Sequence, residues 1–454
     1  MAMRRLETRK DKIKLIRSIV EGLILLLLIL SMIRAIFVFT TYQPYNPKDS
    51  SIVTGKDQGF IAISYLGVDR TGTNTLIATE ALEKQLNALY KNGYVTITQK
   101  DIQNYYKNGV ALPEKALFLM YEDGRRDTAI FAQKIMENFN YKATVLTYAE
   151  KFNNHDTKFL LPEDLKNLLK NSYWEQGSNG YRLEYINVFD RYDNYLGELT
   201  SLEYSRVNRY LERKYNQYLM DFIRDKNGIP KETYDEMKSR IEYDYMQMEK
   251  IYSEEVGEIP AAYVLMHANT GSYANNDKVS NINESCIKSL FQMNFNREGS
   301  VLNTTENDIY DLTRLQPQAY WSTNHLLMRI QDEQKLPVIF EEGNKTWSQR
   351  FTELEGEAEF FDDSLILTSR PQGNGLLKVN GSNQAEDIIF SARLKGNKYG
   401  TQSVLIRADE EQKNYISVTL KNNVLYIYEC LHGSEHILFE QTLDLFDRIT
   451  HHSA

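Results

Sequence analysis

Apolar runs alternate with helical patterns from residue 59 onward. Short runs of apolar and β-branched residues indicate buried strands. These runs are Phe60–Tyr65, Tyr94–Ile97, Leu117–Met120 and Ala143–Thr147, and later Tyr263–His267, Asn294–Arg297 and Leu312–Arg314. Residues 79–92, 98–107, 127–139 and 321–330 have the apolar spacing of helices. Strands that alternate with helices predict a parallel sheet with right-handed crossovers. We therefore expect an α/β domain over residues 59–335.

Residues 201–256 interrupt this alternation. They are rich in Tyr, Arg, Glu and Met at helical spacing, with a stripe that begins at Tyr204 and continues through Tyr215. The pattern predicts two long helices on either side of Asn227–Pro230, as a helical insertion in the α/β domain. Such an insertion either forms one wall of a substrate cleft or only packs against the domain.

After Pro337 the pattern changes to short strands separated by turn residues such as Asn422 and Asn423. Regularly spaced short strands predict an all-β sandwich domain, here at 340–448. The strands around Ser403–Arg407, Asn414–Val418 and Leu425–Tyr428 resemble laminin-G or concanavalin-like carbohydrate modules. A spacer without a ligand is the alternative interpretation of this domain.

The N-terminal residues predict a membrane anchor. Gly22–Ile33 is almost entirely apolar, and the segment 18–39 is long enough to cross a bilayer of about 30 Å. Residues 1–17 carry a basic excess that predicts a cytoplasmic tail, and 40–58 read as a stalk. The alternative is a cleaved signal peptide, but no clean small-x-small site follows the apolar run. We expect a single-pass protein of the cell membrane, with its N-terminus inside and its domains extracellular.

The charge distribution limits the partners. The net charge is −9, and residues 1–17 contribute seven Lys and Arg against two acids, so the rest of the chain is strongly acidic. An acidic body argues against a nucleic-acid partner. The 31 tyrosines suit either apolar cores or sugar-binding surfaces. Cys286 and Cys430 lie far apart and form no metal-binding spacing.

Two adjacent acids follow the strand at 116–121. In parallel α/β proteins the carboxyl ends of the strands line the active site, and Glu122 and Asp123 stand at such an end, before Gly124. Neighbouring carboxylates there are costly unless they do chemistry, hold a cation or meet basic partners. Glu122 and Asp123 are therefore the candidate catalytic residues.

The order of elements over 60–150 resembles the polysaccharide deacetylase family. Leu119–Gly124 is similar to that family's Thr-Phe-Asp-Asp-Gly motif, Asn92–Tyr94 to its first unit, and Asn140–Thr144 to the strand after its next helix. The resemblance implies a distorted (β/α) barrel that removes acetyl groups from polysaccharide with a divalent metal. It also implies that Glu122 takes the place of the general base and Asp123 that of the metal-binding aspartate.

The chain departs from the family pattern where the metal-binding histidines belong. Asn179 stands in place of the first histidine, and no histidine follows nearby. His267–Gly271 takes the place of a later arginine- and proline-containing motif. No set of one aspartate and two histidines can be assembled, so we expect no zinc-type site and no cofactor. The candidate substrate-binding residues are Arg182, Asp190, His267 and Asn269.

Two functions remain open. The leading hypothesis is a hydrolase that acts on polysaccharide through these carboxylates without a metal, either as a glycosidase or as a deacetylase-like enzyme. The alternative is a catalytically inactive polysaccharide-binding or assembly protein that works with a membrane synthase or exporter. In the second case the acids at 122 and 123 pair with Arg125 or Arg126.

Overall fold

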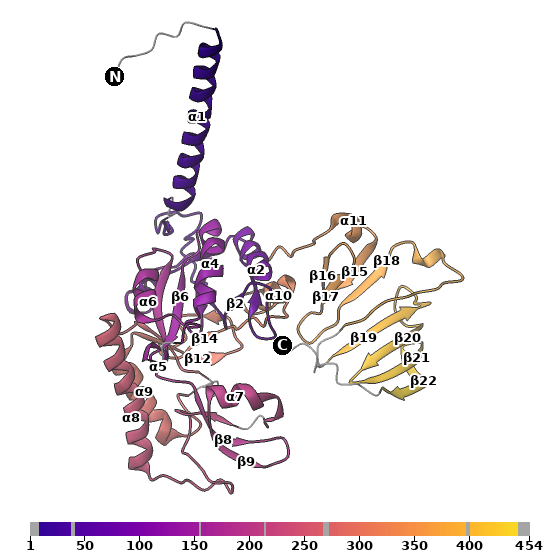
Figure 1. Cartoon of the computed structure of the whole chain (residues 1–454). Helices are drawn as coiled ribbons and strands as arrows, with labels where there is room; N and C mark the ends of the chain where they lie inside the picture. The colour runs from indigo at the N-terminus through magenta and orange to yellow at the C-terminus, as the bar shows by residue number, and fades with distance from the viewer. Residues whose placement is uncertain are drawn as a thin grey trace. The chain divides into compact units, whose positions relative to one another are not determined.

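The structure is a computed structural model that describes residues 9–37, 41–153, 156–212, 215–266, 272–395 and 400–443 (Figure 1). Contacts between Cα atoms divide the chain into two units, Met1–Asn380 and Gly381–Ala454. The first unit contains the α/β domain, and the second contains a separate β-sheet.

A nine-stranded sheet forms the centre of the first unit. Along the main path the strands are ordered β13-β1-β5-β6-β7-β11-β12-β14, and β4 pairs with β5 outside this path. All pairings are parallel except that of β13 with β1. The strands are β1 (Phe60–Tyr65), β4 (Val95–Thr96), β5 (Ala116–Tyr121), β6 (Ala143–Tyr148), β7 (Trp174–Gly180), β11 (Ala262–Val264), β12 (Met293–Glu298), β13 (Leu302–Asn303) and β14 (Leu312–Arg314).

The sheet curls into an almost closed barrel. Leu315, directly after β14, donates its backbone N–H to Ala62 and accepts one from Ser64, so the end of the last strand meets the first. An apolar cluster with Phe60, Phe118 and Phe295 draws on strands all round the barrel and fills its interior. The rings of Phe118 and Phe295 stack at 5.5 Å. The expected α/β, barrel-like architecture is thereby confirmed.

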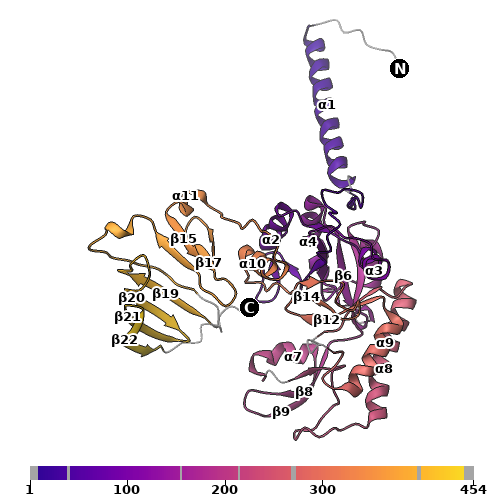
Figure 2. The same ribbon diagram turned by 180° about the vertical axis from the view of Figure 1, so that it is seen from behind.

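Helices cover the outside of the sheet, and a second, larger apolar cluster lies between the two layers (Figure 2). Thr98 starts α3 as expected, because its hydroxyl accepts from the N–H of Asp101 in a capping box. The helices of this layer are α2 (Thr79–Lys91), α3 (Gln99–Asn108), α4 (Arg126–Phe139), α5 (Glu150–Asn153), α6 (Pro162–Leu168), α9 (Asp277–Leu290) and α10 (Thr323–Gln334).

The insertion is only partly helical, which corrects the expectation for 201–256. It starts before residue 201 with the hairpin β8 (Glu184–Phe189) and β9 (Tyr195–Thr200), and β10 (Asn216–Gln217) pairs with β8. The first expected helix ends early, at α7 (Ser201–Val207), because its tyrosines pack on the hairpin. The rings of Tyr204 and Tyr185 stack at 4.0 Å. The second expected helix is α8 (Tyr234–Ile251).

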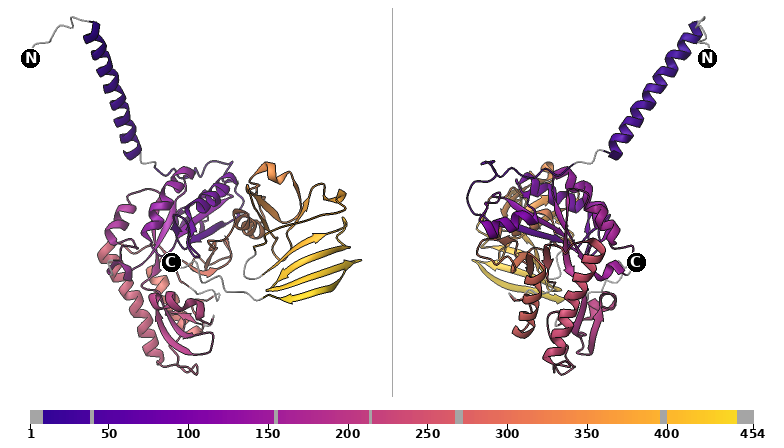
Figure 3. Two further views of the ribbon diagram at one scale, coloured as in Figure 1. Left: turned by 45° about the vertical axis from the view of Figure 1, so that its right-hand side comes forward. Right: turned by 90° about the vertical axis from the view of Figure 1, so that its left-hand side faces the viewer.

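The strands after residue 340 do not confirm a β-sandwich. In the first unit, β15 (Phe351–Glu355) pairs with β18 (Leu376–Val379), and β16 (Glu357–Phe360) pairs with β17 (Leu365–Thr368). The second unit contains one antiparallel four-stranded sheet (Figure 3). Its strands are β19 (Thr401–Ile406), β20 (Tyr415–Lys421), β21 (Val424–Leu431) and β22 (Ser434–Thr442). Residues 387–394, which have the apolar content of a strand, form none, and Ile389 among them is fully exposed.

The N-terminal part of the first unit is α1 (Arg9–Phe37), which includes most of the segment expected to be a membrane anchor. Among the residues that the structure describes, no helix meets the length and apolarity needed to cross a bilayer. The transmembrane helix expected at 18–39 is therefore not confirmed.

Candidate functional site

A tight turn at the end of β5 positions the two candidate acids. Asp123 and Gly124 both have positive φ values, of 64° and 59°, and α4 begins two residues later. The backbone N–H of Asp123 donates to Asn179 Oδ1 at 3.1 Å, which ties the turn to the end of β7. A non-glycine residue held at positive φ is strained, and such strain is common at functional sites.

Glu122 is fully buried and is held by three donors at one oxygen. Its Oε1 accepts from Arg314 Nε at 2.9 Å, from Ser64 Oγ at 2.7 Å and from Gln316 Nε2 at 2.8 Å. Its Oε2 is buried and has no hydrogen-bond partner. The carboxylate is thus fixed by groups from β1 and from the end of β14.

Arg314 is also fully buried and lies between two acids. Besides Glu122, its guanidinium contacts Glu298 Oε1 at 3.1 Å. Burial acts to lower the pKa of Arg314, but the charges of Glu122 and Glu298 outweigh it and raise that pKa. The expected pairing of Glu122 with Arg125 or Arg126 is wrong, since those arginines contact Asp127 and Asp164 instead.

Asp123 is partly exposed and has a strongly shifted pKa. Burial and the nearby charge of Glu122 raise the pKa of Asp123 from its usual value of 3.8 to about 7, although Arg125 and Lys151 act in the opposite direction. At neutral pH this carboxyl group is therefore present in both protonation states, as a group that accepts and returns protons requires.

Tyr148 ends β6, and its side chain is close enough to the two acids to be affected by their charges. Its hydroxyl is buried and makes no hydrogen bond to the described residues. Burial raises the pKa of Tyr148 well above its usual value, and the charges of Asp123 and Glu122 add to this shift. Tyr148 is thus a neutral hydroxyl that keeps its proton.

The residues at the strand ends do not fit the divalent metal that the deacetylase resemblance implies. Across the described ranges, no group of three or more His, Cys, Asp or Glu side chains is arranged to hold a metal ion. Asn179 already accepts from Asp123, and its amide N–H₂ donates to Met266 Sδ at 3.4 Å. Glu122 is occupied by Arg314. Asp123 alone is not a zinc site, which takes three or four nitrogen, sulfur or oxygen ligands.

The other candidate residues lie in different places. Arg182 follows β7 and contacts Asp244 and Glu184. Asp190 lies at the tip of the β8–β9 hairpin, where its carboxylate accepts from the N–H groups of Tyr192 and Asn194 and shapes the turn. His267 and Asn269 lie outside the described residues.

Sequence reasoning missed the groups that hold Glu122. Ser64 lies near the carboxyl end of β1, Arg314 ends β14, and Gln316 lies two residues beyond it. All three lie at or just after the carboxyl ends of barrel strands, and this position is the reason why Glu122 and Asp123 were chosen as candidates. The same criterion, applied to the predicted strand Leu312–Arg314, would have identified Arg314.

Two Escherichia coli proteins share sequence with part of the chain. Both are poly-beta-1,6-N-acetyl-D-glucosamine N-deacetylases. The protein of strain K12 is 28% identical over 109 residues, and that of O157:H7 is 31% identical over 88 residues. The chain resembles polysaccharide deacetylases. The matches cover 23% and 19% of this chain but only 16% and 13% of those proteins, so the chain spans less than a fifth of either relative. No family model matches the chain.

Solved structures of deacetylases resemble the chain with low TM-scores and with lower sequence identity than the two E. coli proteins. The Streptococcus pyogenes deacetylase PplD in complex with acetate has a TM-score of 0.42 at 11% identity, over 60% of this chain and 99% of that one. A de-N-acetylase from Aggregatibacter actinomycetemcomitans has a TM-score of 0.45 at 15% identity, over 59% and 98%. IcaB from Ammonifex degensii has a TM-score of 0.42 at 12% identity, over 58% and 93%. We draw no inference from these low scores.

Proposed function

We propose that the barrel is a carbohydrate hydrolase that removes acetyl groups from a polysaccharide, with Asp123 as its general base. The observation that carries the proposal is the environment of Asp123. It is a partly exposed carboxyl group at a barrel strand end, with a strained backbone and a pKa of about 7. The names of the two E. coli relatives support acetylated polysaccharide as the substrate class.

The arrangement favours acyl hydrolysis over cleavage of a glycosidic bond. Glycosidases need two carboxyl groups that both reach the scissile bond, about 5 to 9.5 Å apart. Of the two adjacent acids, only Asp123 is partly exposed, because Glu122 has no exposed surface and is bound by Arg314. The nearby Glu298 is also bound by Arg314. A single acid–base group is sufficient for attack of water on an acetyl carbonyl.

In the proposed reaction, the Asp123 carboxylate takes a proton from a water molecule as its oxygen attacks the acetyl carbonyl carbon. The carbonyl π electrons move onto oxygen and give a tetrahedral oxyanion. The oxyanion then re-forms the carbonyl double bond, the bond to the sugar nitrogen or oxygen breaks with its electron pair on that atom, and the proton from Asp123 passes to this leaving group. Acetate and a free amine or hydroxyl are the products.

The test is acetate release by the full-length protein from acetylated polysaccharides such as poly-N-acetylglucosamine. We expect Asp123→Asn to lower the rate by about 100-fold or more, because general base catalysis contributes about this much. Asp127→Asn, a half-exposed acid in the next helix, is the matched control and should stay within about twofold. Release that is equally fast in both variants would contradict the role of Asp123.

A second candidate function is the inactive polysaccharide-binding protein that works beside a membrane synthase or exporter. The Glu122–Arg314–Glu298 cluster favours it, because the position of the family's general base is filled by a buried ion pair. Binding of glycan by the wild-type protein, without release of acetate at any pH from 5 to 9, would establish this function and exclude the first.

We also propose an extracellular location for the α/β domain. Its basis is the sequence of residues 1–39, where a basic run precedes an apolar one, and not the described helices. The measurement is protease access to an epitope inserted at the β8–β9 turn in intact cells. Protection of that epitope until the cells are lysed would contradict the proposed location.

A further inference from the structure

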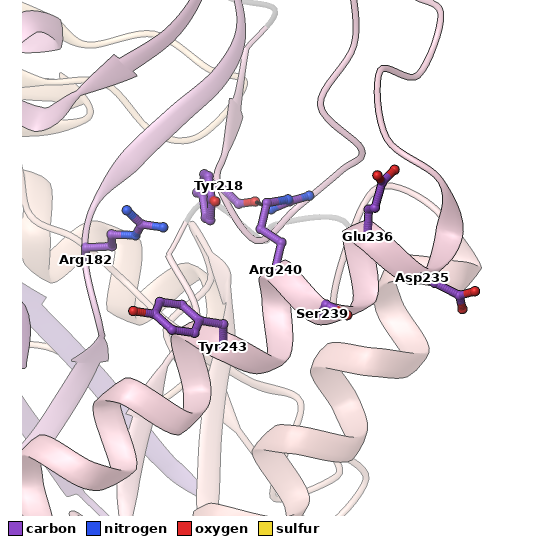
Figure 4. A pocket seen from close by; sticks show the side chains of 7 residues that line it. All are labelled: Arg182, Tyr218, Asp235, Glu236, Ser239, Arg240 and Tyr243. Carbon is purple, nitrogen blue, oxygen red and sulfur yellow. Dashed lines mark hydrogen bonds between the residues drawn. The ribbon is translucent and has the colours of Figure 1, made fainter.

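A pocket lies on the insertion, outside the barrel. It has a volume of about 640 Å³ and lies between α8, the segment after β10 and the loop after β7 (Figure 4). This volume is in the range of small-ligand pockets. Its lining residues are Arg182, Tyr218, Asp235, Glu236, Ser239, Arg240 and Tyr243.

Two arginines hold the central tyrosine of this pocket in place. The guanidinium carbons of Arg182 and Arg240 lie 4.4 Å and 4.6 Å from the centroid of the Tyr218 ring, one on either side of it in Figure 4. Asp244 and Glu184 fix Arg182 at 3.1 Å each. Such a stack is rigid before any ligand arrives, which lowers the entropic cost of binding.

Arg240 is fixed in a similar way. Its Nε and Nη2 donate to the two carboxylate oxygens of Glu232 at 2.9 Å and 2.7 Å, and Nη2 also donates to the backbone carbonyl of Asp221 at 2.8 Å. Both guanidinium groups therefore already have carboxylate partners. They are not available to bind an incoming anion.

The charge around the pocket is acidic. Two guanidinium groups face five carboxylates, which are Glu184, Glu232, Asp235, Glu236 and Asp244. Acidic ligands are therefore repelled, and neutral or cationic ligands are tolerated.

The open side of the pocket combines an aromatic ring with hydroxyl and carboxylate groups. Tyr243 is 49% exposed, and Ser239 and Asp235 on the same helix are also exposed. An exposed tyrosine offers an apolar face and a polar rim, which matches the apolar face and hydroxyl groups of a pyranose ring.

We propose that this pocket binds a non-acidic pyranose unit of a polysaccharide chain, against Tyr243, at a subsite separate from Asp123. The proposal takes its ligand class from the proposed function, but its site residues are different.

The experiment measures binding of hexasaccharides to the full-length protein by titration calorimetry. The probes are the hexamers of N-acetylglucosamine and of glucosamine, and a hexamer of galacturonate. We expect at least one non-acidic hexamer to bind with a Kd at or below about 1 mM, and Tyr243→Ala to weaken it by about tenfold. Tyr192→Ala removes another exposed tyrosine, on the hairpin turn, and should leave binding unchanged.

Three results would overturn the proposal: no binding of either non-acidic hexamer, binding of the galacturonate hexamer at least as tight, or equal effects of the two tyrosine variants. The two non-acidic probes identify the sugar, since only binding of the cationic hexamer falls with added salt. Acetate release and hexamer binding are measured on the same wild-type and Asp123→Asn proteins, which separates the two proposals. If the hexamer binds but neither protein releases acetate, only the proposed function fails. If the wild type releases acetate but binds no hexamer at the pocket, only this inference fails.

Discussion

At the scale of single residues, the buried contact between Glu122 and Arg314 is important for stability. Neither side chain is exposed, so each charge depends on the other for compensation. Removing one partner of a buried pair typically costs about 3–5 kcal/mol. A variant at Glu122 that loses activity is therefore not by itself evidence of a catalytic role, because the fold around it is also weakened.

We predict that Glu122→Gln lowers the free energy of unfolding by about 3 kcal/mol, although Glu298 still contacts Arg314. Urea denaturation followed by tryptophan fluorescence measures this change. Asp311→Asn breaks the more exposed pair with Arg297 and is the control, with an expected loss below about 1 kcal/mol. Equal losses in the two variants would show that Arg314 is adequately compensated without Glu122.

The shifted pKa of Asp123 predicts that the stability of the protein depends on pH. Its pKa is raised in the folded protein from 3.8 to about 7, so between these values the folded state binds more protons than the unfolded state. The contribution of Asp123 to stability is thus greatest at low pH and falls as the pH rises toward 7. We predict that Asp123→Asn stabilises the protein at pH 8 by about 2 kcal/mol, which allows for partial exposure, and has little effect at pH 4.

Asparagine also tolerates the positive φ of this position, so the comparison is free of backbone strain. Thermal unfolding of both proteins between pH 4 and pH 8 is the measurement. A difference that does not change with pH would mean that the pKa of Asp123 is the same in the folded and unfolded states. In the activity assay the same group predicts acetate release that rises with pH through about 7, because the carboxylate is the base.

At the scale of elements, the turn between β5 and α4 requires Gly124. A Cβ atom there would lie 2.6 Å from Thr147 Cγ2 on β6, in addition to the strain of a φ of +59°. We predict that Gly124→Ala costs about 3 kcal/mol. Gly93→Ala, in the turn between α2 and β4, has φ +81° but open space around the added atom, and should cost about 1 kcal/mol. Denaturation midpoints that fall equally would contradict the close contact with Thr147.

The sequence predicted β1, β5 and β6 well because each is a compact apolar run that is buried along its whole length. The central strand β7, with the sequence WEQGSNG, contains no such run and was not predicted as a strand. β1, β5 and β6 begin and end within one residue of the expected bounds. It failed in the insertion, where the tyrosines at 204 and 215 have helical spacing but pack on a hairpin through Tyr185. Propensity and periodicity give no information about a partner that lies elsewhere in the chain.

The candidate site was predicted only in part for a similar reason. Glu122 and Asp123 are adjacent in sequence and end one recognisable strand, so their position at the sheet edge follows from local pattern. Arg314 meets Glu122 across 192 positions of sequence. That contact forms only when the barrel closes. The order of strands and helices predicts that a barrel closes, but no local pattern around Glu122 or Arg314 predicts that these two residues meet.

At the scale of the whole molecule, metal content separates this protein from the metal-dependent scheme that the resemblance implies. We predict that the purified full-length protein holds no stoichiometric zinc and that treatment with EDTA changes neither acetate release nor the melting temperature. The reason is that Arg314 binds the Glu122 carboxylate, and Asn179 Oδ1 already accepts from the backbone N–H of Asp123. Elemental analysis is the measurement. One zinc per chain that is lost together with activity in Asp123→Ala would contradict the prediction.

Closure of the barrel also determines when the protein can complete its folding. Ile63 on β1 pairs with Leu315, directly after β14, and Glu122 forms its ion pair with Arg314 at the end of β14. Both contacts need the last strand of the barrel. During synthesis the segment with β1 and β5 leaves the ribosome long before its charge partner exists, at rates of about 5–20 residues per second. Contacts so distant in sequence slow the search for the native state. We expect a nascent chain shorter than 312 residues to leave the barrel open between β1 and β14. Such a chain depends on chaperones until Arg314 has been synthesised.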